Sequence, residues 1–277
     1  MKEKKKAARP CRVKPPLTEV NREERMERCT EILEAIKSGE IDREFFEEAL
    51  LYVDCKTFNV NTTSRKKMLS RKGARRFVWR TRSEGLLPEC TKPSQFAAKG
   101  GGRGLKIFAA IGGGRLILFE EYRKWNRHVA ARLTKKLREE CERIWPEKKQ
   151  CVIHLCHDND RSFNSAENAL AEEKCLFELF PIPVRSPELM PLDYTHWKWI
   201  LDKMREHEDR VGWRNRKESV KEYSDRLRRT AFSLNKFPEV VNRAHACMVD
   251  HAEMIVGAGG GHFEDGKKAL KRWRDKR

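Results

Sequence analysis

Three aspartates lie in or next to apolar segments, where a charged side chain is rarely left uncompensated. Asp54 lies inside an apolar stretch, Asp158 follows another, and Asp193 lies in the first turn of an amphipathic segment. A carboxylate in or beside a hydrophobic strand is costly unless something compensates it. Three converging carboxylates could bind two divalent ions, activate a water or a 3′-hydroxyl and cleave a phosphodiester. Magnesium suits this role, because it prefers oxygen ligands and keeps several waters.

Each aspartate also has a purely structural explanation. Asp54 could lie on the polar face of its strand, Asp158 could form a turn, and Asp193 could begin a helix. Taken singly, the residues favour these explanations. The choice therefore depends on the sequence around them.

The elements that would position these residues follow from the spacing of apolar side chains. Strands are predicted at 50–60, 76–80, 105–111, 115–119, 150–157 and 176–180. Helices are predicted at 18–37, 42–50, 125–144, 164–174, 192–208, 214–235 and 238–255. Thr18 is the expected cap of the first helix, and the glycines at 112–114 predict a hairpin turn. The mixture indicates an α/β protein, with a mixed sheet flanked by helices.

The chain of 277 residues carries a net charge of +18, which points to a polyanion such as nucleic acid. The excess is concentrated in residues 1–14, 61–82 and 267–277. We expect residues 1–16 to form a flexible basic arm and residues 266–277 a basic tail. The two tails are candidate DNA grips or nuclear-import signals, so the nucleus is the expected location.

The segment 61–82, which follows the strand of Asp54, contains nine cations and no acid. These side chains are candidate contacts to DNA phosphates, namely Arg65, Lys66, Lys67, Arg71, Lys72, Arg75, Arg76, Arg80 and Arg82. A solvated loop and strand face is the alternative. Phe77 and Trp79 could stack on bases, although core packing is favoured. The basic segment 214–229 fits either a DNA track or a solvated helix face.

Other site types are less well supported. The nine cysteines include no Cys-x-x-Cys pair and are expected to be reduced thiols. A zinc site is conceivable in 151–157, but a strand would point its Cys and His side chains to opposite faces. The glycine runs lack the context of a phosphate-binding loop. No apolar run is long enough for a membrane span, so no membrane partner is expected.

The sequence around the aspartates resembles the catalytic domain of mariner-type transposases, in the Tc/mariner superfamily. Asp158 and Asp193 lie in short motifs typical of that family, and 34 residues separate them, which is the mariner spacing. Further words match in the same order along the chain. The matching segments are 52–58, His157-Asp-Asn-Asp160, Ser186-Pro-Glu-Leu-Met-Pro-Leu-Asp-Tyr194, 76–80, 88–91, 99–102 and 258–263. Together they span about residues 17–265.

The resemblance implies a ribonuclease-H-like fold over 17–265, with Asp54, Asp158 and Asp193 as catalytic residues and ligands of two Mg²⁺ or Mn²⁺ ions. His157 and Asn159 would support these ligands from behind. The implied activity is DNA cleavage and strand transfer on double-stranded DNA, both transposon ends and target, and a homodimer is compatible with it. The family also carries helix-turn-helix modules before the catalytic domain, and we expect this chain to lack them.

Three departures leave alternatives open. Cys55 stands where the family usually has Glu, Phe163 where it has His, and Glu188 where it has Asp. These changes spare the three ligands but could weaken the groups that support them. The first alternative is an inactive or domesticated DNA-binding relic. The second is a ribonuclease or structure-specific nuclease on the same fold.

Overall fold

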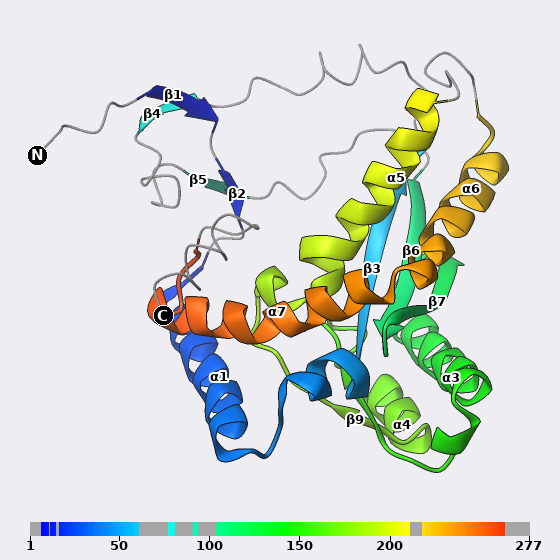
Figure 1. Cartoon of the computed structure of the whole chain (residues 1–277), viewed down its shortest axis with the longest axis horizontal. Coiled ribbons are helices and arrows are strands. Elements are labelled where there is room, and N and C mark those ends of the chain that lie inside the picture. Colours follow the sequence, from blue (N-terminus) through cyan, green and yellow to red (C-terminus); the bar gives the residue numbers. More distant parts are fainter. Residues whose placement is uncertain are drawn as a thin grey trace, which may run out of the picture.

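A computed structural model describes residues 7–10, 12–14, 17–60, 77–80, 91–93, 104–210 and 218–263. Its centre is a five-stranded mixed sheet in the order β7-β6-β3-β8-β9 (Figure 1). The strands are β3 (Leu50–Asn59), β6 (Gly104–Gly112), β7 (Arg115–Tyr122), β8 (Ile153–Cys156) and β9 (Phe177–Leu179). β3, β6 and β7 pair antiparallel, whereas β8 and β9 run parallel to β3. The predicted mixed sheet is therefore confirmed.

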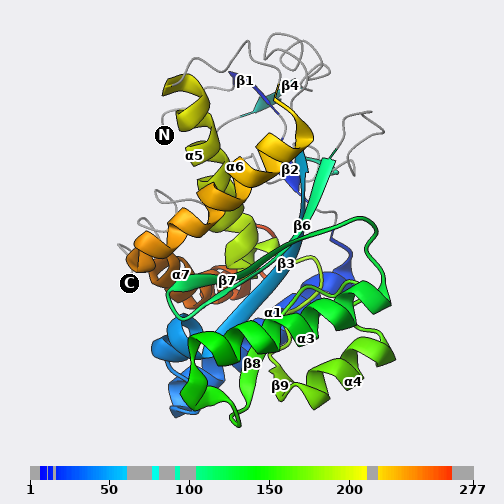
Figure 2. The ribbon, with the colours of Figure 1, turned by 90° about the vertical axis from the view of Figure 1, so that its right-hand side faces the viewer.

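Helices cover both faces of this sheet (Figures 1 and 2). On one side pack α1 (Glu19–Ser38), α5 (Trp197–Arg210), α6 (Val220–Phe232) and α7 (Pro238–Gly257). On the other pack α3 (Arg127–Ile144) and α4 (Ala166–Lys174). Short turns connect them: η1 (Phe45–Ala49), η4 (Pro146–Lys148), η5 (Pro187–Leu189), η6 (Leu192–His196) and η8 (Ser233–Lys236). No helix in the described part of the chain is both long and apolar enough to span a membrane.

The sheet separates two hydrophobic cores because successive side chains of a strand point to opposite faces. Leu50 and Tyr52 of β3 pack with α1, α5 and α7. Leu51 and Val53 pack in the other core, with α3. By this alternation Asp54 belongs to the face that carries α5.

Helix starts differ from the predicted ones by a few residues, for a reason visible in the sequence. Thr18 caps α1 as predicted, accepting a hydrogen bond from Asn21 N. Asn126 and Ser165 cap α3 and α4, so these helices begin at Arg127 and Ala166 rather than at 125 and 164. The predicted helix at 42–50 contains the π-helical turn η1, and the helix predicted from 214 begins at Val220.

Two short strand pairings involve residues of the basic arm. β1 (Ala7–Pro10) pairs antiparallel with β4 (Phe77–Arg80), and β2 (Arg12–Lys14) pairs parallel with β5 (Thr91–Pro93). The flexibility of residues 1–16 stays a prediction. The strand predicted at 76–80 is confirmed as β4. The basic tail at 266–277 lies outside the described residues.

A buried arginine joins three distant parts of the chain. Arg25 of α1 donates to Gly260 O (2.8 Å), Arg185 O (2.8 Å) and Ser186 Oγ (2.8 Å). It also lies 3.3 Å from Glu188 Oε2, and both side chains are buried. Gly260 has φ +73°, and a Cβ there would lie 2.0 Å from Arg22 O, so only glycine fits this approach. The Ser-Pro-Glu segment before Asp193 is therefore fixed to both α1 and the C-terminal glycines.

Arg25→Met should destabilise the protein by about 3–5 kcal/mol, because it leaves the Glu188 carboxylate buried without its guanidinium partner. Urea denaturation followed by circular dichroism measures the change. Arg28→Met is the matched control, since Arg28 of the same helix makes only a partly exposed ion pair with Glu31 and a bond to Pro181 O. Its effect should stay within about 1 kcal/mol. Equal losses in the two variants would contradict this role of Arg25.

Candidate active site

Strand register places Asp54 and Asp158 at the same level of the sheet. β3 and β8 run parallel, with Tyr52 opposite Cys156. Asp54 lies two residues beyond Tyr52, and Asp158 two residues beyond Cys156. Tyr52 and Cys156 belong to the same core, on the face covered by α5. Asp54 thus lies within β3 and Asp158 just beyond the carboxyl end of the adjacent parallel strand β8, the side on which open α/β sheets bind their ligands.

Asp54 is nearly buried, with 7% of its surface exposed. Its Oδ1 accepts a hydrogen bond from Cys55 N (2.7 Å), and its Oδ2 accepts one from Trp197 Nε1 (2.6 Å). Burial raises the pKa of Asp54 to about 8, and the negative charges of Asp193 and Asp158 add to this, while the two donors act against it. The carboxylate is therefore held in place but lacks full compensation for its charge.

Asp193 lies on η6, which is fastened to α7. Tyr194 OH donates to Ala244 O (2.5 Å), and His196 Nε2 lies 3.4 Å from His245 Nε2. Burial lowers the pKa of His196 to about 3, so the pair is neutral and one ring can donate to the other. Asp193 itself is exposed and lies in the first turn of η6, whose other end continues into α5.

The nearest cation to Asp193 comes from the strand of Asp54. Lys56 Nζ lies 3.2 Å from Asp193 Oδ1, and both side chains are about one third exposed. The Lys56 ammonium therefore lies where a metal cation could otherwise bind the Asp193 carboxylate. The ion pair between Lys56 and Asp193 links β3 to η6. The hydrogen bond from Trp197 to Asp54 links α5 to β3.

Asp158 keeps access to solvent, yet the surrounding protein affects its ionisation. Removal of water by neighbouring groups raises its pKa, and the charges of Asp160 and Asp193 contribute further. Asp160 N donates to Asp158 Oδ1 (3.3 Å) and acts in the opposite direction. The charges of Asp193 and Asp158 raise the pKa of Asp54, and that of Asp193 raises the pKa of Asp158, so the predicted carboxylates lie within electrostatic range of one another.

The two residues predicted to support the ligands stabilise the loop around Asp158. His157 is buried, and its Nδ1 lies 2.8 Å from Asp158 O. Its Nε2 lies 3.2 Å from Glu172 Oε1, an electrostatic contact without the angles of a hydrogen bond. Asn159 Nδ2 donates to Ile182 O (2.9 Å). Both residues contact backbone groups rather than the three carboxylates.

Phe163, where the resemblance leads one to expect His, fills an aromatic cluster. Its ring stacks on His157 (4.5 Å, 12°) and meets Trp125 edge-on (5.0 Å, 64°). Trp125 Nε1 in turn donates to Asp160 Oδ1 (2.8 Å). The residue at 163 thus positions the loop after Asp158 through packing and offers no ligand.

The candidate DNA contacts cannot be placed relative to this site. Arg65, Lys66, Lys67, Arg71, Lys72, Arg75, Arg76 and Arg82 lie outside the described residues, and of Arg80 only the backbone in β4 is described. The same holds for the side chains of Phe77 and Trp79.

The donor chemistry fits a divalent ion, although the arrangement falls short of a formed site. Carboxylate oxygens are the ligands that Mg²⁺ and Mn²⁺ prefer, and the charge on Asp54 is incompletely compensated. Across the described ranges, however, no three His, Cys, Asp or Glu side chains lie close enough together to hold a metal. This also applies to the conceivable zinc residues in 151–157. Lys56 is the cation that contacts Asp193 instead.

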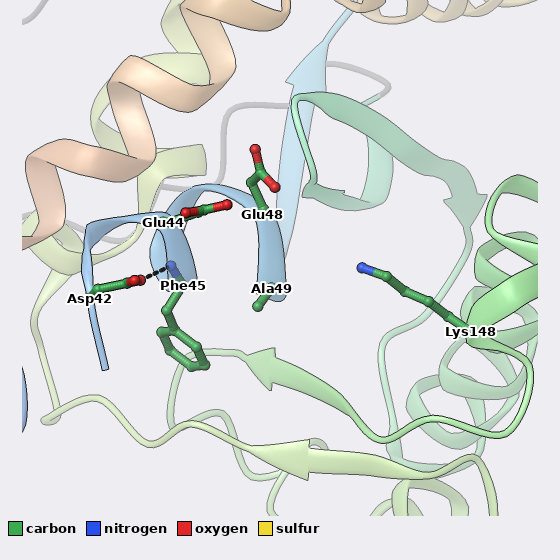
Figure 3. A pocket seen from close by; sticks show the side chains of 6 residues that line it. All are labelled: Asp42, Glu44, Phe45, Glu48, Ala49 and Lys148. Carbon is green, nitrogen blue, oxygen red and sulfur yellow. Dashed lines mark hydrogen bonds between the residues drawn. The ribbon is translucent and has the colours of Figure 1, made fainter. Parts of the chain in front are cut away.

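A pocket of about 250 Å³ lies away from the aspartates, beside the first residue of β3 (Figure 3). Leu50 is roughly 13 Å from Asp54 along the strand. The pocket is lined by Asp42, Glu44, Phe45, Glu48, Ala49 and Lys148. Sequence analysis did not predict it, because it forms between η1 and η4, which are distant in sequence. Three carboxylates and one lysine do not suit a nucleic-acid phosphate.

Known structures resemble this fold over most of its length. The catalytic domain of Mos1 mariner transposase matches with a TM-score of 0.63 and 17% identity, over 91% of this chain and 100% of that domain. The chain has the ribonuclease-H-like fold of a transposase catalytic domain. A pre-cleavage Mos1 transpososome matches with a TM-score of 0.66 and 20% identity, over 95% of this chain and 69% of that one.

Other matching structures contain the Mos1 transposase catalytic domain with Raltegravir and Mn, and a Mos1 paired-end complex with the left transposon end. No protein-family model matches the chain, and no curated protein does. At this level of identity the comparisons establish the fold, and the chemistry must be argued from the residues.

Asp54→Asn should change how stability depends on pH. Because burial raises the folded-state pKa to about 8, the unfolded chain releases this proton earlier, and wild-type stability falls between about pH 4 and pH 8. The unfolding free energy of Asp54→Asn relative to wild type should therefore rise by about 3–4 kcal/mol from pH 5 to pH 8. Thermal and urea unfolding in EDTA measure the difference. Asp225→Asn, an exposed residue of α6, should parallel wild type, and identical curves for all three proteins would refute the prediction.

Proposed function

We propose that this chain is a metal-dependent DNA-cleaving and strand-transferring enzyme, with Asp54, Asp158 and Asp193 as its catalytic carboxylates. The observation that carries the proposal is geometric: strand register brings Asp54 and Asp158 to one level of the sheet, and contacts from Trp197 and Lys56 bring the Asp193 segment to the strand of Asp54. The transposase-like fold supports it. Mg²⁺ or Mn²⁺, as two ions, would stabilise the charge that develops on phosphodiester oxygens.

The residues of the chain would divide the remaining work. Asp54, fixed by two donors, and Asp158, at the end of the next strand, would form the rigid part of the site. Asp193, exposed on η6, would complete it once Lys56 releases its carboxylate. Lys56 would then be free to contact a DNA phosphate. His157 and Asn159 would hold the loop of Asp158 in place.

The proposed substrate is double-stranded DNA, as transposon ends and target. The basic segment 61–82 begins one residue after the described end of the Asp54 strand, so its nine cations would be available to phosphates near the site. A homodimer and a nuclear location belong to the same proposal, because joining two DNA ends requires two active sites and access to chromosomal DNA.

The test is nicking of supercoiled DNA by the purified chain with Mg²⁺, with Mn²⁺ and with EDTA. Nicking should require a divalent ion and should be lost in Asp54→Ala, Asp158→Ala and Asp193→Ala, while Asp225→Asn keeps wild-type activity. Activity that survives any one of the three alanine variants would remove that residue from the site. Faster cleavage of an RNA–DNA hybrid than of duplex DNA would indicate a ribonuclease instead.

A DNA-binding protein without catalytic activity is the second candidate. The ion pair between Lys56 and Asp193, and the lack of a three-donor metal group among the described residues, favour it. Calorimetric titration with Mn²⁺ separates the two candidates. Ion binding that depends on the three aspartates supports the enzyme, and DNA binding without ion binding supports the second candidate.

A further inference from the structure

Trp197 makes an unusual contact for a core tryptophan. It is 2% exposed, and its indole N–H donates to Asp54 Oδ2 over 2.6 Å. A hydrogen bond from a neutral donor to a carboxylate is among the stronger kinds in proteins. The Trp197 ring is fixed by an edge-on contact with Phe58 (5.6 Å, 74°). Phe58 lies four residues beyond Asp54, on the same face of β3.

The second oxygen of Asp54 is occupied as well, by Cys55 N. The terminal torsion of an aspartate is otherwise broad, so a single donor would leave the carboxylate free to turn. Two donors on two different oxygens fix its plane. Each oxygen retains a lone pair, and these lone pairs face a direction that the two donors determine.

Trp197 also connects the first and third aspartates. It lies four residues after Asp193, one helical turn further along the η6–α5 segment, and therefore on the same side. A shift of this segment would move Asp193 and the donor to Asp54 together. Trp199, two residues further along and on another side of the helix, packs instead against Phe237 (5.9 Å).

We infer that Trp197 is a positioning residue, whose indole N–H sets the orientation of the Asp54 carboxylate toward a divalent cation. The inference rests on the proposed function, because Asp54 is one of its ligands. Trp197 would not touch the ion or the DNA. Its effect would reach the site through Asp54, as groups behind metal ligands do in other proteins.

The first experiment is independent of metal. Hydrogen exchange of tryptophan indole N–H groups is followed by NMR in the metal-free chain, with Trp197→Phe identifying the signal. The Trp197 proton should exchange at least about tenfold faster in Asp54→Ala than in wild type, and the Trp199 proton should not change. Equal exchange in the two proteins would overturn the inference. Nuclear Overhauser contacts between the Trp197 and Phe58 rings assign the same signal, so the result holds even if Trp197→Phe does not fold.

The second experiment titrates Mn²⁺ calorimetrically into wild type, Trp197→Phe and Trp199→Phe, with circular dichroism as the check of folding. Trp197→Phe keeps an aromatic ring but removes the donor together with part of the ring volume, and Trp199→Phe makes the same change in size. The dissociation constant should rise about 10- to 100-fold in Trp197→Phe and stay unchanged in Trp199→Phe. Unchanged affinity in Trp197→Phe, where Asp54→Ala abolishes binding, would overturn the inference. Absence of Mn²⁺ binding in wild type would overturn the proposed function instead, and the exchange measurement alone would then decide the contact.

Discussion

β3 is hydrogen-bonded along both edges, and this central position constrains the whole site. A strand in the middle of a sheet must supply alternate side chains to two cores, and β3 does so with Leu50 and Tyr52 on one face and Leu51 and Val53 on the other. Asp54 interrupts the first of these series. The fold accepts a carboxylate there because Cys55 N and Trp197 Nε1 donate to its two oxygens, and parallel pairing with β8 brings the carboxylate of Asp158 to the same level.

The electrostatics of the site follow from that placement. The three carboxylates are close enough for their charges to repel. Among the described residues, two N–H donors compensate Asp54 and the Lys56 ammonium compensates Asp193. Donors fix orientation but carry no full positive charge, so much of the repulsion is left in place. Such a region has low affinity for further anions until cations neutralise it. The same arrangement that makes it a candidate for catalysis thus makes it dependent on what binds there.

The sequence allowed the order of strands and helices to be predicted, together with the three aspartates, because both depend on local patterns. The hairpin between β6 and β7 followed from its glycines, which adopt φ +52° and +71° at Gly113 and Gly114. Contacts between residues distant in sequence could not be predicted from these local patterns. Trp197 lies within the helix predicted at 192–208, with no sign of its bond to Asp54. Glu188 appeared as a departure from a motif, whereas the structure buries Glu188 against Arg25. Nothing local to either residue indicates its partner.

The contact of Arg25 with Gly260 has a consequence for the order of folding. The two residues are 235 positions apart, so α1 cannot acquire its buried partners until nearly all the intervening chain exists. At ordinary rates of synthesis this delay is about 10–50 s. During this delay, Arg25 and the apolar face of α1 lack the partners that bury them in the folded protein. Closing so long a loop is also slow. The helix α1, made early in synthesis, is therefore among the last elements to dock.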